Sequence, residues 1–193
     1  MKSNFKLNPY FYLLTFLVLT GCYSVEKAVI KSKPGSDKIN WPETYQPQKS
    51  QFFVHNEIDI QASPQKVWQI LIQAERWPDW YIGAKDVKIL DETSTILKDD
   101  SVFYWKTMGQ RFESVIKEFE EPYRLSWESK KSTIQGHHAW LIIPTAYGCR
   151  VITSESQSGF LTFMQKVFIP NKLENLHQLW LEEIKQKAES DAL

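Results

Sequence analysis

One histidine and one carboxylate in this sequence can be placed side by side, and together they could move protons. His138 lies in an apolar segment, and Glu155 lies in the next segment, beyond a turn centred near Tyr147. If that turn pairs Ile143 with Arg150 in two antiparallel strands, the same register sets His138 opposite Glu155. The carboxylate would then orient the imidazole ring and raise its pKa, as acid/base catalysis requires.

A structural role for His138 is the simpler interpretation. No nucleophile or second acid accompanies the pair, and buried histidines are usually hydrogen-bonded. A shift of one residue in the register would also separate the two side chains. We therefore expect ligand binding in preference to catalysis, with His138 and Glu155 as the candidate acid/base residues if the protein is an enzyme.

Metal and cofactor sites are not indicated. His137 and His138 are adjacent, but neighbours on a strand face opposite sides and cannot easily chelate one ion. His55 and His177 are isolated and are expected to face solvent, and no cysteine cluster supplies further ligands. The sequence also lacks a glycine-rich phosphate loop, a Gly-x-Ser-x-Gly motif and a dinucleotide fingerprint. We expect no metal and no cofactor.

Aromatic residues recur at alternate positions of the predicted strands and therefore share a face. If that face is concave, the rings line an apolar pocket with few polar groups, which is typical of small-molecule sites. The alternative is that they simply fill the core. The candidate ligand-binding residues are Trp80, Phe103, Trp105, Phe112, Trp127, His138 and Trp140.

The elements that must position these side chains begin with a strand and a short helix. Residues 52–62 alternate apolar and polar, which is the period of a half-buried strand. Ser63 can cap a helix and Pro64 suits its first position, while Pro78 disfavours helical geometry at Trp77. A short helix followed by an aromatic turn is therefore predicted.

Six further strand-like segments follow, and a helix closes the chain. The segments span about 84–91, 101–107, 110–119, 123–130, 133–143 and 148–157. An apolar stretch then runs from Gly159 to Ile169, and Pro170 interrupts it. Residues after Asn171 have the pattern of a capped amphipathic helix. These elements predict an α+β fold in which a curved antiparallel sheet wraps around a long C-terminal helix and leaves a cavity.

The motifs between Phe52 and the C-terminus also have a characteristic order. They are Ala62-Ser63-Pro64 with Val67-Trp68, Arg76-Trp77-Pro78-Asp79-Trp80, Phe103-x-Trp105, Arg124-Leu125-Ser126-Trp127, His138-x-Trp140, Gly148-Cys149-Arg150-Val151 with Glu155, and Gly159. This order resembles the helix-grip superfamily (SRPBCC or START-like), which includes START lipid-transfer domains, the birch-pollen-allergen type and bacterial polyketide cyclase/dehydratase-like proteins. The resemblance implies a cavity for a hydrophobic ligand or, in the cyclase branch, for a substrate.

The N-terminus resembles a bacterial lipoprotein signal peptide. Lys2 and Lys6 precede an apolar run, and the run ends in Leu19-Thr20-Gly21-Cys22. The run is too short to span a bilayer comfortably, since spanning needs about 20 apolar residues. The resemblance implies cleavage before Cys22, lipidation of that cysteine, and anchorage in a bacterial envelope membrane. Tyr23 rather than Asp after Cys22 would favour the outer membrane in a Gram-negative cell.

The expected organisation is a signal peptide at residues 1–21, a tether at 22–51 and one ligand-binding domain at 52–193. The tether is polar and carries prolines, although Trp41 and Tyr45 could dock on the domain. Removing residues 1–21 leaves 21 basic and 23 acidic residues, which argues against a nucleic-acid partner. With Cys22 lipidated, Cys149 has no disulfide partner within the chain. We expect a monomer.

The leading hypothesis is a membrane-anchored protein that binds a hydrophobic small molecule or lipid between the sheet and the last helix. The first alternative is a polyketide cyclase/dehydratase-like enzyme that uses His138 and Glu155. The second alternative is a structural or partner-docking envelope lipoprotein with a filled interior and an exposed apolar patch. A lipocalin is disfavoured because an up-and-down barrel has no place for the helix after Ser63.

Overall fold

The computed structural model describes residues 38–190 of the 193-residue chain. The expected signal peptide, Cys22 and the first part of the tether lie outside the described residues. No helix in the described part has both the length and the apolar character needed to cross a membrane.

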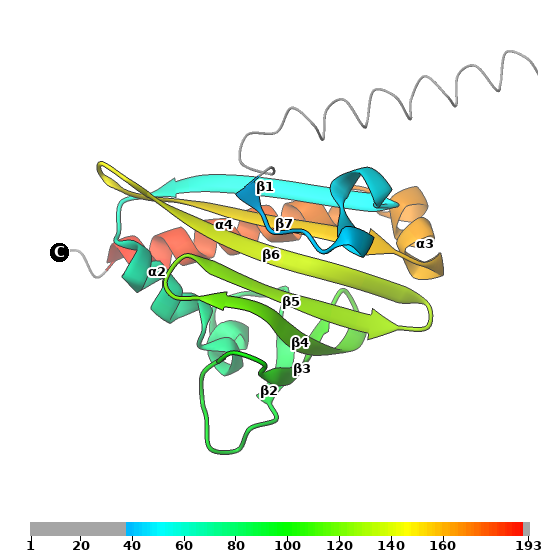
Figure 1. Ribbon diagram of the computed structural model, residues 1–193, viewed down its shortest axis with the longest axis horizontal. Coiled ribbons are helices and arrows are strands. Elements are labelled where there is room, and N and C mark those ends of the chain that lie inside the picture. Colours follow the sequence, from blue (N-terminus) through cyan, green and yellow to red (C-terminus); the bar gives the residue numbers. More distant parts are fainter. Residues whose placement is uncertain (1–37, 191–193) are drawn as a thin grey trace, which may run out of the picture. The chain divides into compact units, whose positions relative to one another are not determined.

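Within residues 38–190, seven antiparallel strands form one curved sheet in the order β1-β7-β6-β5-β4-β3-β2 (Figure 1). The strands are β1 (Phe52–Ile60), β2 (Lys85–Ile89), β3 (Val102–Thr107), β4 (Gln110–Glu120), β5 (Arg124–Lys131), β6 (Ile134–Thr145) and β7 (Gly148–Ser158). Their bounds agree closely with the predicted segments. The register also agrees, because Ile143 pairs with Arg150 and His138 pairs with Glu155.

The two predicted helices begin where the sequence signals place their starts. Helix α2 (Pro64–Leu71) begins after Ser63, whose hydroxyl accepts a hydrogen bond from the Lys66 backbone N–H at 3.3 Å. The 3₁₀ helix η4 (Ala74–Asp79) forms the aromatic turn. Two helices follow β7, namely α3 (Phe160–Phe168) and α4 (Lys172–Ser190). The apolar stretch after Gly159 is therefore a separate helix.

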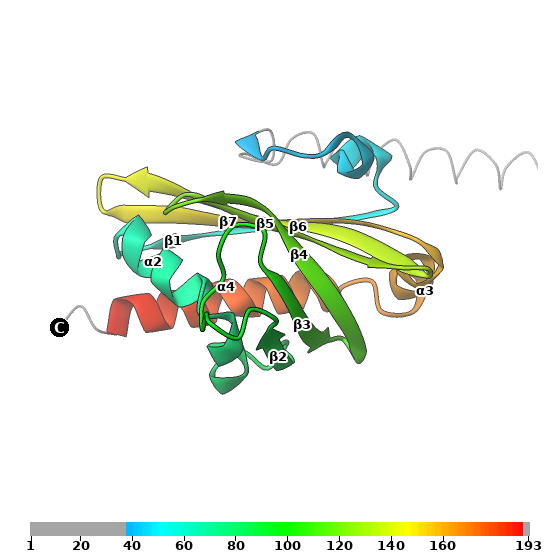
Figure 2. The same ribbon diagram turned by 60° about the horizontal axis from the view of Figure 1, so that its bottom comes forward.

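Helix α4 packs along the concave face of the sheet, as the α+β helix-grip prediction requires (Figure 2). Its buried side chains follow one helical stripe and include Leu173, His177, Trp180 and Ile184. Trp180 is central to the core, since its ring stacks on Tyr81 at a centroid distance of 4.3 Å. The aromatic core thus joins the last helix to the sheet and to η4.

The opposite face of the sheet is partly covered by residues 38–51, which we call the N-terminal strap (Figure 2). The strap contains two short 3₁₀ helices, η2 (Glu43–Tyr45) and η3 (Pro47–Lys49). Ile39 packs against apolar side chains of β6 and β7, and the Tyr45 ring stacks on His137 at 5.5 Å. This part of the expected tether therefore docks on the domain.

Candidate functional site

A cavity of about 280 Å³ lies between the concave face of the sheet, α3 and α4. Most of its wall is apolar, and strands β3 to β7 contribute alternate residues to it, as the pleat of the sheet dictates. The lining residues on which the site depends are Tyr81, Trp105, Phe112, Trp127, Ser129, His138, Glu155, Gln157, Met164, Phe168, His177 and Trp180.

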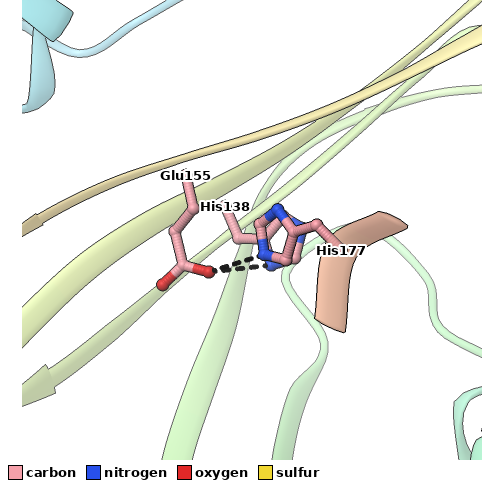
Figure 3. A group of neighbouring side chains, drawn as sticks. All are labelled: His138, Glu155 and His177. Carbon is pink, nitrogen blue, oxygen red and sulfur yellow. Dashed lines mark hydrogen bonds and ion pairs between the residues drawn. The ribbon is translucent and has the colours of Figure 1, made fainter. Parts of the chain in front are cut away.

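Three polar side chains from three different elements meet at the cavity wall, and we call them the His–Glu–His cluster (Figure 3). His138 comes from β6, Glu155 from β7 and His177 from α4. The Glu155 Oε2 atom lies 3.4 Å from His138 Nδ1 and 3.2 Å from His177 Nε2. One carboxylate oxygen therefore faces both imidazole rings.

Neighbouring polar groups fix the cluster. The Gln157 side-chain amide donates a hydrogen bond to the other carboxylate oxygen, Glu155 Oε1, at 2.5 Å. On the far side of His138, its Nε2 atom lies 2.7 Å from the Thr153 hydroxyl. The His138 and His177 rings stack with centroids 4.5 Å apart, and the Trp127 ring lies equally close to His138. The rings have little room to rotate.

Burial determines the charge of His138. Burial in this apolar core lowers the pKa of His138 well below its ordinary value, and the nearby His177 and His137 lower it further. His138 is therefore neutral at pH 7 and carries one ring proton. The tautomer protonated on Nδ1 fits best, because it directs the N–H toward the Glu155 carboxylate and lets Nε2 accept from the Thr153 hydroxyl.

The His–Glu–His cluster is also the group among the described residues whose atoms lie close enough to suggest a metal, all within 4.8 Å of one another. Metal chelation needs nitrogen lone pairs that converge on one point. The two imidazole planes are instead stacked and nearly parallel, with an angle of 20° between them. A nitrogen lone pair lies in the plane of its ring, so the lone pairs of the two rings do not converge on one ion. The arrangement fits a carboxylate that is hydrogen-bonded to His177 and lies close to His138 better than it fits a metal site.

The predicted ligand-binding residues divide into three groups. Trp105, Phe112, Trp127 and His138 line the cavity. Phe103 and Trp140 are buried in the core but do not line the cavity. Phe103 packs on Trp77, and Trp140 packs on Trp180. Trp80 lies outside the cavity, where the Lys187 ammonium lies 5.8 Å from its ring.

Two predictions about histidines were wrong. His177 was expected to face solvent, but it is 2% exposed and contacts Glu155. His55 is also buried, and its Nδ1 atom lies 2.8 Å from the Ser154 hydroxyl. The sequence spacing indicates the burial of His177. This residue follows Leu173 by four positions and precedes Trp180 by three, which places it on the apolar stripe of α4.

Comparisons with known proteins agree with this fold. The model of the family described as polyketide cyclase / dehydrase and lipid transport matches residues 51–189. The hypothetical protein jhp0584 from Helicobacter pylori is similar to this chain, with 31% identity and a TM-score of 0.72 over 78% of this chain and 95% of that one.

Two more distant structures share the fold. The di-domain ARO/CYC protein StfQ from the steffimycin biosynthetic pathway is 12% identical, with a TM-score of 0.60 over 72% of this chain and 52% of its own. Norcoclaurine synthase from Thalictrum flavum is also 12% identical, with a TM-score of 0.57 over 73% of this chain and 96% of its own. No curated protein matches the chain.

Proposed function

Since the chain belongs to the polyketide cyclase/dehydrase and lipid transport family, we propose that it binds a small hydrophobic molecule that carries one polar group. The observation that carries this proposal is the cavity of about 280 Å³, whose mostly apolar wall holds the His–Glu–His cluster. The apolar part of the ligand would lie against Trp105, Phe112 and Trp127. Its polar group would face the His–Glu–His cluster.

The size of the cavity narrows the ligand class. Ligand sites typically measure about 300–1,000 Å³, so this cavity lies just below the lower end of the range. One or two rings, or a short acyl chain, would fill it, whereas a whole phospholipid would not. Binding would be driven mainly by burial of apolar surface.

The His–Glu–His cluster would select the polar group of the ligand. Glu155 already accepts from Gln157, and its remaining acceptor capacity faces the cavity with His177. A hydroxyl or phenol can both donate to a carboxylate and accept from an imidazole N–H, so it would satisfy both partners at once. A ligand without such a group would leave these buried atoms less well paired and would bind more weakly.

Uptake of a ligand from solution tests this proposal. Native mass spectrometry of residues 23–193 should detect a bound small molecule, or saturable uptake of an added hydrophobic phenol. Met164→Trp, which fills the cavity from α3, should abolish uptake. Phe163→Trp, on the outward side of the same helix, is the matched control and should retain it. Equal uptake by both variants would refute binding in this cavity.

Acid/base catalysis is the second candidate function. The observation that favours it is that His138 and His177 both present a nitrogen within 3.4 Å of one Glu155 oxygen at the cavity wall. The Glu155 carboxylate could take a proton from a bound substrate, or stabilise positive charge that develops beside it. A poly-β-keto thioester should then be cyclised by the protein and not by Glu155→Gln. Recovery of the unchanged thioester with the unmodified protein would exclude this reaction.

We also propose that the chain is anchored through lipid on Cys22 in a bacterial envelope membrane. The support is the sequence Leu19-Thr20-Gly21-Cys22 after an apolar run. Mass spectrometry of the N-terminal peptide should find Cys22 as the first residue, with acyl chains attached. An unmodified Cys22, or retention of residues 1–21, would refute anchorage of this kind. Two acyl chains would hold the protein stably at the membrane.

A further inference from the structure

Helix α3 and the residue after it carry a cluster of exposed apolar side chains. Phe160, Phe163 and Val167 follow the spacing of one helical stripe, and Phe168 and Ile169 adjoin it. Each of these side chains is between 41% and 70% exposed. They make up five of the ten large apolar side chains that are exposed in the described part of the chain. Such a concentration marks an interaction surface.

The orientation of α3 is the reverse of what a surface helix normally shows. Its buried residues are polar, namely Thr162 and Gln165, while phenylalanines face outward. A helix of a water-soluble domain places its polar side toward water. The outward face of α3 is therefore suited to an apolar environment.

Lysines border this apolar face, and one of them, Lys130, is paired with Glu128 at 2.9 Å. Between Gly159 and Leu173 the charged residues are Lys166 and Lys172, with no acidic residue. The turn between β5 and β6 lies beside α3, because the Leu161 backbone N–H donates to the Thr133 carbonyl at 2.9 Å (Figure 2). Lys130 and Lys131 come just before this turn. Exposed phenylalanines bordered by lysines complement the apolar interior and anionic headgroups of a lipid bilayer.

The same helix forms part of the cavity wall. Met164 lines the cavity, and Phe168 and Ile169 both line it and remain exposed. The cavity therefore reaches the surface within the apolar face of α3. A shallow groove continues from Ile169 past Leu176 to Leu179 on α4, so the apolar surface extends beyond α3 itself.

We propose that α3 docks on an anionic lipid bilayer, with Phe160, Phe163, Val167, Phe168 and Ile169 inserted at the level of the acyl chains. The four lysines at positions 130, 131, 166 and 172 contact the headgroups. The cavity mouth then opens at the bilayer surface, where hydrophobic molecules concentrate. Docking itself is independent of the proposed function, whereas the direct passage of ligand between bilayer and cavity rests on it.

Vesicle flotation tests the docking surface without the lipid anchor. Residues 23–193 contain all of the described residues, 38–190, and lack Cys22 and the residues before it. This protein should bind vesicles of phosphatidylcholine with 30% phosphatidylglycerol, and should bind pure phosphatidylcholine vesicles more weakly. Raising the salt to 1 M should weaken the binding to anionic vesicles, because salt screens the lysines.

Paired substitutions then assign the binding to α3. The double variant Phe160→Ser with Phe163→Ser should lower the vesicle partition coefficient by about tenfold or more. Its two phenyl rings are no longer there to be transferred from water into the bilayer. The matched control is Tyr147→Ser, which removes an exposed ring from the β6–β7 turn and should leave binding unchanged. Lys130→Ala with Lys131→Ala should reduce the preference for anionic vesicles.

Other occupants of the α3 face would give different results. Absence of vesicle binding, or equal binding by the Phe160/Phe163 variant, would overturn the proposal. Dimerisation in solution that this variant abolishes would assign the face to a second copy of the chain. Vesicle binding that appears only after removal of residues 23–37 would mean that this segment covers the α3 face in the longer protein. Uptake of ligand from solution by the Phe160/Phe163 variant should persist, which separates docking from the proposed function.

Discussion

Acid should weaken this fold through His137, the histidine beneath the N-terminal strap. Its ring is 1% exposed between the rings of Trp41 and Tyr45, and neither ring nitrogen has a hydrogen-bond partner among the described residues. Burial lowers the pKa of His137 to about 4, although Glu128 and Glu155 partly oppose the shift. Protonation of the folded protein is therefore disfavoured at mildly acidic pH, where the unfolded chain binds the proton more readily.

The sign and size of the effect follow from this pKa. An unfolded histidine has a pKa of about 6.5, so between pH 6.5 and pH 4 the unfolded chain binds a proton that the folded protein does not. Stability is thus fully present above pH 6.5 and is lost as the pH falls through this window. Between pH 7 and pH 5, His137 should lower the free energy of unfolding by about 2 kcal/mol.

The substitution His137→Phe isolates this contribution. A phenyl ring can keep the contacts with Trp41 and Tyr45 but does not titrate. Urea unfolding followed by tryptophan fluorescence at pH 7 and pH 5 gives the loss of stability for each protein. The variant should lose about 2 kcal/mol less than the unmodified protein. Burial of His138 also lowers stability in acid, but both proteins share that effect. Equal losses would refute the reasoning.

Three further predictions concern the core and the cluster, and urea unfolding at pH 7 measures each of them. Trp180→Ala should lower the free energy of unfolding by about 3–5 kcal/mol, because it leaves a large void among aromatic rings; a smaller loss would mean that the core collapses into the space. Thr153→Val should cost about 1–3 kcal/mol, because His138 Nε2 loses its buried partner; no loss would show that water replaces the hydroxyl. Arg150→Ala removes an exposed ion pair with Asp59 and should not shift the unfolding midpoint; a clear shift would contradict this view of surface pairs.

Most of the fold could be predicted because its signals are local. Ser63 and Pro64 mark the start of α2, and the residues between Ile143 and Arg150 set the register of the β6–β7 hairpin. That register is sufficient to predict that His138 lies opposite Glu155. Period-two alternation then determined which strand residues share the concave face.

The rest of the site depends on how distant elements pack. The apolar stripe of α4 indicates that His177 faces the sheet, but no local pattern says which strand residue it meets, so its contact with Glu155 could not be derived from the sequence. Likewise, the stretch after Gly159 is visibly apolar, but only the packed structure shows that Thr162 is buried and Phe163 is exposed. Tertiary packing can override the usual preference of a residue for core or surface.

The sheet order has a consequence for synthesis of the chain. Strand β1 is made first among the seven described strands, yet its partner is β7, made last, and Phe52 pairs with Gln157. Neighbouring strands from β2 to β7 can pair soon after each leaves the ribosome, whereas β1 must wait for more than half of the chain. The apolar side chains of β1 stay unpartnered through that interval. During synthesis or refolding, β1 is therefore the strand that most needs a chaperone to shield it.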